Sequence, residues 1–185
     1  MPAGDLTTLA NVEGFLKLQA GNADEALLSR LITASSIFAQ SWCNRQFASQ
    51  SFSETRDGTG SNRMVFGNPP VSAVTSVVID GWSIPIGDAV SAPGYYFTPR
   101  RLMLNGYRFS VGLGNVELSY EGGFAAIPDD IEQAVIEIVV HAYKERDRIG
   151  HSSQAMAGET TSYIVRDMPP RAESILRNYK RVVPI

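Results

Sequence analysis

The segment "PDDIEQAVIEIVVHAYKERDRIG", residues 128–150, carries the strongest structural pattern in the chain. Its proline and paired aspartates suit the first turn of a helix, and its basic residues and final glycine suit the end. Apolar residues recur at helical spacing on two adjoining stripes, so the pattern predicts a helix that packs against two neighbours. The first stripe holds Ile131, Ala134, Val135, Ile138 and Ala142, and the second holds Ile136, Val140 and Tyr143.

Two helices are predicted upstream of this segment. They cover residues 8–18, "TLANVEGFLKL", and residues 21–47, "GNADEALLSRLITASSIFAQSWCNRQF". Thr8 stands at the cap position of the first, and Asn22 with Glu25 makes a capping-box pattern in the second. We expect the second of these helices to cover one stripe of the long helix, and either an inserted sheet or another subunit to cover the other. The candidate subunit-interface residues are therefore Ile136, Val140 and Tyr143.

Between about Gln50 and Gly123 the apolar period changes to that of a strand, and turn residues multiply. The tip "DGTGSN", residues 57–62, predicts a hairpin between the strands on either side of it. Asp80-Gly81 is a strong signal for a two-residue hairpin turn, and "GLGN", residues 112–115, is interpreted as another turn. The region therefore predicts an antiparallel sheet or small barrel inserted in a helical frame.

The sequence as a whole predicts an α+β fold. Its helical core has three main helices and a short C-terminal helix, and it carries an inserted antiparallel β-rich subdomain. A strand is expected in "ETTSYIVRD", residues 159–167, and the short helix starts at the tandem prolines of "MPPRAESILRNY", residues 168–179. We expect one structural unit overall, made of N-terminal helices (1–49), the β subdomain (50–125), the long core helix (126–150), and a loop, strand, short helix and extended C-terminal arm (151–185).

Composition excludes several classes of protein. The formal net charge of the 185 residues is -3, which argues against a dedicated nucleic-acid binder held by phosphate contacts. Cys43 is the only cysteine, so the chain has no intramolecular disulfide and suits a reducing cytoplasm. The N-terminus lacks the basic and apolar regions of a signal peptide, and no apolar run reaches the length of a membrane span. We therefore expect a soluble protein of the cell interior.

The segment "HAYKERDRIGHSS", residues 141–153, is the most suggestive candidate for chemistry. His141, Glu145 and His151 could hold a metal in a hydrolase, but zinc needs three or four ligands, and no standard ligand spacing is present. Its charges alternate in sign, as on a solvated helix face. No nucleophile elbow or phosphate-binding loop occurs elsewhere. We expect no catalytic residues, no metal and no cofactor, so the chain is not predicted to be an enzyme.

A second hypothesis from another class stays open. The β subdomain could be a carbohydrate- or ligand-binding module, with an aromatic platform made of Trp82, Tyr95 and Tyr96. Strands with one wet face explain these aromatic residues more simply.

The order of the elements resembles that of head–tail connector proteins of long-tailed bacteriophages, the adaptor or head-completion proteins, which have relatives in gene transfer agents. The resemblance runs from about Leu6 to Pro184. Its most specific parts are "GNVELSYEGGFAAIPDDIEQAVIEIVVHAYKERD", residues 114–147, and "MPPRAESILRNYKRVVP", residues 168–184. None of these motifs is catalytic.

The resemblance implies a structural virion protein at the head–tail interface that is assembled in the host cytoplasm. Identical subunits, with twelve expected, would form a ring under the portal protein and lengthen the DNA channel. The ring would receive the stopper or tail-completion protein, and genomic DNA would pass through it without sequence-specific binding. A closed head-to-tail ring needs two different complementary patches on each subunit.

The C-terminal residues "KRVVPI" are predicted to be extended, because Pro184 cannot continue a helix. An end this apolar is expected to be buried, either by folding back on its own core or by gripping another protein. We favour the second alternative, because the resemblance implies portal contacts for the C-terminal segments of the family. The candidate portal-binding residues are Lys180, Arg181, Val182, Val183, Pro184 and Ile185.

Overall fold

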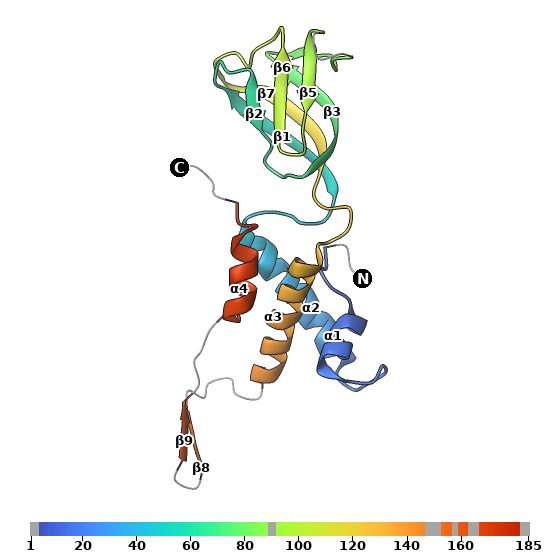
Figure 1. Ribbon diagram of the computed structural model, residues 1–185, viewed down its shortest axis with the longest axis vertical. Helices are drawn as coiled ribbons and strands as arrows, with labels where there is room; N and C mark the ends of the chain where they lie inside the picture. The colour runs from blue at the N-terminus through green and yellow to red at the C-terminus, as the bar shows by residue number, and fades with distance from the viewer. Residues whose placement is uncertain (1–3, 89–91, 147–152, 157–158, 163–166, 182–185) are drawn as a thin grey trace. The chain divides into compact units, whose positions relative to one another are not determined.

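The chain contains two compact units, which are described separately (Figure 1). The helical unit comprises Met1–Arg45 and Ile127–Ile185, and the β unit comprises Gln46–Ala126. Helices and antiparallel sheets confirm the predicted α+β class with a β-rich insertion. A computed structural model describes residues 4–88, 92–146, 153–156, 159–162 and 167–181.

The helical unit is organised around α3. Helices α1, α2 and α4 each pack against this helix (Figure 1). The unit also contains an antiparallel pair, β8 and β9, in the region where a single strand over residues 159–167 was expected. The bounds of these elements are α1 Leu9–Leu16, α2 Glu25–Cys43, α3 Asp129–Glu145, α4 Pro170–Arg177, β8 Ser153–Met156 and β9 Glu159–Ser162.

The first two helices begin for different reasons. Thr8 caps α1 as predicted, because its hydroxyl accepts a hydrogen bond from the Asn11 backbone N–H at 3.2 Å. The predicted start of α2 is wrong, since the helix begins at Glu25. The side-chain oxygen of Asn22 accepts the Asp24 N–H at 2.9 Å, which folds the preceding loop into a turn instead of capping the helix. The Glu25 carboxylate accepts the N–H of Gly21.

Both apolar stripes of α3 are buried except at the C-terminal end of the helix. There Ala142, in the first stripe, and Tyr143, in the second, are partly exposed. Because α1, α2 and α4 surround α3, helices provide the neighbours that the wide apolar arc requires. The buried apolar residues of α3 are Ile131, Ala134, Val135, Ile136, Ile138, Val139 and Val140, and those of the other helices include Val12, Leu28, Ile32, Ala39, Cys43, Ala172 and Leu176.

The β unit consists of two antiparallel sheets that share one core (Figure 1). The first sheet has the order β1-β7-β3-β4, and the second has the order β2-β6-β5. The strands are β1 Gln50–Gly58, β2 Arg63–Val65, β3 Val71–Ile79, β4 Trp82–Ser83, β5 Gly94–Phe97, β6 Arg101–Asn105 and β7 Gly112–Gly122. The core between them contains Phe66, Val71, Val77, Ile79, Ile84, Tyr95, Leu102, Leu104, Phe109, Val116, Leu118 and Tyr120.

Strand pairing departs from the predicted hairpins at two points. The tip at residues 57–62 does not join a hairpin, because β1 pairs with β7 and β2 pairs with β6 in the other sheet. Residues 112–115 are not a turn but the first part of β7. The turn at Asp80-Gly81 is confirmed: it joins β3 to β4, and both residues have positive φ, 52° and 81°, as a type I′ turn requires.

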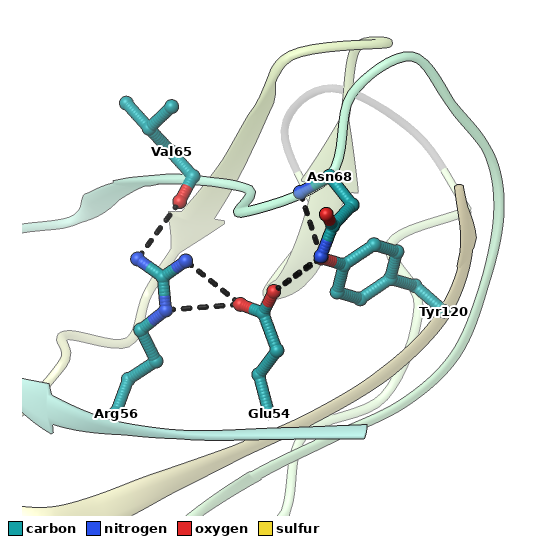
Figure 2. A network of polar contacts seen from close by, with 5 residues as sticks. All are labelled: Glu54, Arg56, Val65, Asn68 and Tyr120. Carbon is teal, nitrogen blue, oxygen red and sulfur yellow. Dashed lines mark hydrogen bonds and ion pairs between the residues drawn. The ribbon is translucent and has the colours of Figure 1, made fainter. Parts of the chain in front are cut away.

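A polar network links β1 to three other parts of the β unit (Figure 2). The Glu54 carboxylate accepts hydrogen bonds from the hydroxyl of Tyr120 in β7 at 2.6 Å and from the side-chain amide of Asn68 at 3.1 Å. It also pairs with the guanidinium of Arg56 at 2.7 Å, and that guanidinium donates to the carbonyl of Val65 in β2 at 3.3 Å. Because the network reaches β1, β2 and β7, it holds the two sheets together at this edge.

Tyr120 is at the centre of this network. Its ring is buried against Phe66 and Phe52, with centroids 4.8 and 5.6 Å away, and its hydroxyl also accepts the backbone N–H of Asn68 at 3.1 Å. Burial, followed by the hydrogen bond to Glu54, raises the pKa of Tyr120 to about 12. The hydroxyl therefore stays protonated and donates to the carboxylate over the whole physiological pH range.

The burial of α3 predicts the effect of a charge at Val140. Val140→Asp places an unpaired carboxylate at a buried position, so it should lower the free energy of unfolding by about 3 kcal/mol or more. The matched control is Lys144→Asp, on the exposed side of the same helix, with a cost of about 1 kcal/mol at most. Thermal unfolding of the free protein, followed by circular dichroism, measures both. Unchanged melting of Val140→Asp would show that the second stripe is not core.

The Tyr120 network predicts a pH-dependent substitution effect. Tyr120→Phe leaves the Asn68 N–H without its acceptor and removes one of the donors to the Glu54 carboxylate, so it should destabilise the protein by about 1–3 kcal/mol at pH 7. The pKa of Tyr120 is raised from 10.0 to about 12, so its contribution is complete below pH 10 and is lost as the pH rises towards 12. The difference between wild type and variant should therefore narrow over that interval in urea titrations. The exposed Tyr107→Phe is the control, with an effect within about ±0.5 kcal/mol.

Candidate interaction surfaces

The stripe predicted as a subunit interface lies mostly inside the chain. Ile136 and Val140 are each only 6% exposed in a single chain. Packing within the chain therefore accounts for both residues without a second subunit. Tyr143 is partly exposed, so a contact with a neighbouring copy along this stripe stays a prediction that depends on Tyr143.

Tyr143 is held by residues far from it in the sequence. Its hydroxyl donates a hydrogen bond to the carboxylate of Asp24, and this contact is the main reason why the pKa of Tyr143 is raised. The guanidinium of Arg146 lies 3.8 Å above the Tyr143 ring and 3.8 Å from the Asp24 carboxylate. The three side chains thus join the end of α3 to the start of α2. Sequence reasoning missed Asp24 and Arg146, because no local pattern connects positions 119 residues apart.

The described part of the predicted portal-binding segment contacts its own chain. The ammonium of Lys180 lies 4.2 Å above the Trp42 ring, and the backbone N–H of Arg181 donates to the carbonyl of Cys43 at 2.9 Å. These contacts place the two basic residues at the end of α2. Val182, Val183, Pro184 and Ile185 lie outside the described residues.

The three aromatic residues of the ligand-binding hypothesis do not form one site. Tyr95 is buried and donates its hydroxyl hydrogen to the Val74 carbonyl at 3.2 Å, so it belongs to the core. The hydroxyl of Tyr96 donates to the Ala92 carbonyl at 2.8 Å, and Trp82 alone of the three is largely exposed. The structure therefore shows no aromatic platform of Trp82, Tyr95 and Tyr96. His141 and Glu145 lie on α3, and His151 falls outside the described residues.

The three most exposed apolar side chains of the β unit lie at one end of the first sheet, where the turn after β3 is bonded to the start of β7. The exposed fractions are 77% for Trp82, 81% for Val111 and 91% for Leu113. Trp82 pairs with Ile79, which also pairs with Val116 in β7, three residues after Leu113. We call these three side chains the loop-end surface. Large apolar side chains this exposed at one end of a sheet make a candidate interaction surface.

A hydrogen-bond network fixes the loops that carry the loop-end surface. The Asp80 carboxylate accepts from the hydroxyl of Ser110 and, at 2.9 Å, from the side-chain amide of Asn115. The hydrogen bond from Ser110, and after it the one from Asn115, lowers the pKa of Asp80. The amide oxygen of Asn115 accepts the Gly58 N–H at 2.9 Å, and the Asp57 carboxylate accepts the Gly114 N–H at 2.6 Å. The exposed side chains therefore project from an ordered framework.

Sequence reasoning missed Val111 and Leu113 because residues 112–115 were interpreted as a simple turn. A signal was present, since two large apolar residues flank a glycine beside further turn residues, in "SVGLGN". Turns are usually polar, so apolar side chains within one suggest a contact with another molecule.

The described residues contain little that could perform chemistry. They include no group of three or more His, Cys, Asp or Glu side chains that could hold a metal. Cys43 is buried, and burial raises the pKa of its thiol to about 11, which keeps it protonated and unreactive. No helix in the described part of the chain is long and apolar enough to cross a membrane.

Solved structures of the same fold come from gene transfer agent particles. The neck of an empty particle, computed with C6 symmetry, matches with a TM-score of 0.64 and 20% identity, covering 100% of this chain and 94% of the other. The neck of a native particle, computed with C12 symmetry, matches with a TM-score of 0.61 and 17% identity over 100% and 94%. A chain from the virion of the native particle matches with a TM-score of 0.59 and 19% identity over 99% and 93%. No curated protein sequence matches the chain significantly.

A family model extends over almost the whole sequence. The model described as "Head completion protein" matches residues 5–182, which include every helix and strand of both units. This match confirms the resemblance to head–tail connector proteins that the sequence indicated. The chain therefore belongs to the head completion protein family, whose members are structural proteins of the virion's head–tail interface and not enzymes.

Proposed function

We propose that identical copies of this chain form a ring beneath the portal, lengthen the DNA channel and provide the platform on which the stopper or tail docks. The observation that carries the proposal is the family match over residues 5–182. The fold supports the proposal, because the solved structures of particle necks computed with C6 and C12 symmetry match this chain over its full length. Twelve copies per ring agree with the higher of these symmetries.

The charge of the chain suits a channel that DNA passes without being held. A formal net charge of -3 gives no general attraction for phosphates, whereas a protein that binds DNA tightly neutralises several of them with lysine and arginine. DNA would therefore move through the ring without sequence-specific contacts.

We assign the loop-end surface to the docking of the stopper or tail-completion protein. Trp82, Val111 and Leu113 are exposed in the single chain, and hydrogen bonds through Asp80 and Asn115 hold their loops in place. A fixed tryptophan beside aliphatic side chains is typical of the residues that dominate the binding energy of protein interfaces. Because the framework is already ordered, little conformational freedom would be lost on binding.

We assign portal binding to the end of the C-terminal segment. Burying the side chains of Val182, Val183 and Ile185 would contribute roughly 5–8 kcal/mol before the cost of ordering the segment. One segment would therefore bind weakly. The segments of a whole ring, acting together, would make attachment to the head effectively permanent.

The portal assignment predicts the effect of a short deletion. Removing residues 182–185 should leave the melting temperature of the free protein within about 2 °C of wild type, because the contacts of Lys180 with Trp42 and of Arg181 with Cys43 stay in place. The truncated protein should no longer co-sediment with DNA-filled, tail-less heads. Normal co-sedimentation would contradict portal binding by this segment, and a collapsed melting temperature would show that it folds back on its own core.

The docking assignment predicts a defect confined to the tail. Replacing Trp82 and Leu113 together by serine should change the free energy of unfolding by less than about 1 kcal/mol, since both side chains are largely exposed. Heads carrying the variant should keep the ring but fail to attach tails in an in vitro joining assay. Val65→Ser, at an exposed apolar residue of β2 in the same unit, is the matched control and should join normally. Normal joining by the double variant would remove the docking role from this surface.

A further inference from the structure

The last described residues of the chain are attached to the helical unit at several points. The thiol of Cys43 donates to the carbonyl of Leu176 at 3.5 Å, and the hydroxyl of Tyr179 donates to the carboxylate of Asp130 at 2.7 Å. The contacts of Lys180 with the Trp42 ring and of Arg181 with the Cys43 carbonyl follow directly along the chain. Residues 176–181 are therefore held against the end of α2 and the start of α3.

The hydrogen bond from the Arg181 N–H pairs a backbone carbonyl at the C-terminal end of α2. This helix ends with Asn44 in the left-handed conformation, and the N–H groups of Asn44 and Arg45 bind the carbonyls of Ser41 and Gln40, each at 3.1 Å. Such an ending pairs some of the last carbonyls of a helix and leaves others open. The carbonyl of Cys43 accepts instead from the N–H of Arg181, so the C-terminal segment completes the cap.

The end of α4 is wound so that it reaches this position. The backbone N–H groups of Asn178, Tyr179 and Lys180 bond the carbonyls three residues earlier, at 3.1, 3.0 and 3.3 Å. This spacing is that of a tight 3₁₀ turn, which leads the chain from the helix to α2. The turn brings the Lys180 ammonium over the face of Trp42, where the ring's negative face attracts a cation.

We propose that Trp42, Lys180 and Arg181 form a clasp that fixes the position of Arg181, the residue directly before the proposed portal-binding residues 182–185. Trp42 is then a positioning residue for head binding. The two basic residues serve the clasp, and the portal contacts belong to residues 182–185. This inference rests on the proposed function, because it concerns how the portal-binding segment is presented.

A fixed position of Arg181 would raise the affinity of the C-terminal segment for the portal. A segment that leaves from one defined point has less freedom to lose on binding than a segment that begins to move several residues earlier. The same gain is repeated at every copy in a ring, so a small effect for each copy becomes a large one for the assembly.

The test is a double-mutant cycle on head binding in the full-length chain. Trp42→Leu removes the aromatic face, and Lys180→Met removes the charge but keeps the apolar stem. Each should weaken co-sedimentation with tail-less heads by about two- to fivefold for each copy, the range that an exposed cation–π contact provides. The double variant should bind no worse than either single variant, because both remove the same contact. Trp42→Phe, which keeps an aromatic face, should bind better than Trp42→Leu.

The outcomes separate the clasp from the proposed function. Additive losses in the cycle would show that Lys180 contacts the portal directly and would overturn the clasp. Wild-type binding by Trp42→Leu would overturn it too, provided that deletion of residues 182–185 abolishes binding in the same assay. If that deletion binds normally, it is the portal assignment that fails.

A stability control completes the experiment. Ile138→Val shortens a buried side chain of α3 and lowers the stability of the helical unit away from Trp42. Its head binding should equal that of wild type at a temperature well below its melting point. A loss equal to that of Trp42→Leu would show that reduced stability, and not a misplaced segment, weakens binding.

Discussion

The burial of α3 is the constraint on which the helical unit depends. Its apolar residues cover so much of its circumference that the helix is stable only when other helices surround it. Its acidic first turn adds a polar counterpart: Glu132 accepts from Thr7 at 3.0 Å and from Asn11 at 2.6 Å, and Asp130 accepts from Tyr179. One helix thus binds both the first and the last described segments of the chain. Both ends of the unit are therefore bound to the same helix, although the whole β unit intervenes in the sequence between α2 and α3.

In the β unit, two small sheets must be held against each other over a core of modest size. Glu54 stands on the inward side of β1, where an apolar residue would be expected, and its carboxylate is partly buried. A buried carboxylate is costly unless donors surround it, and here Arg56, Asn68 and Tyr120 provide them. A side chain at Gly67 would lie 2.1 Å from a carboxylate oxygen of Glu54, so the Glu54 side chain would have to shift from its place in the network. The polar cluster is therefore structural, and the requirement for several simultaneous partners makes the pairing of the sheets specific.

The parts of the fold that the sequence predicted are those set by local chemistry. The apolar spacing of α3, the Thr8 cap and the Asp80-Gly81 turn each depend on a few neighbouring residues. Strand pairing was predicted wrongly where it is non-local: β1 pairs with a strand that begins more than fifty residues later, and no local signal favours β7 over β2. The same limit explains the candidate sites. The partners of Tyr143 and Lys180 come from α2 and its N-terminal flank, which chain order alone does not bring near them.

In the proposed docking role, the loop-end surface would serve an assembly without chemistry. Asp57 and Asp80 lie beside it, but both carboxylates accept hydrogen bonds from their own unit. Their role is to hold the loops, which leaves the exposed apolar side chains as the main source of binding energy. Affinity of this kind depends weakly on ionic strength, unlike contacts between exposed charges. If the surface docks a tail protein beside the DNA channel, as proposed, it would gain from this arrangement, because attachment through apolar contacts does not compete with the phosphates or their counterions.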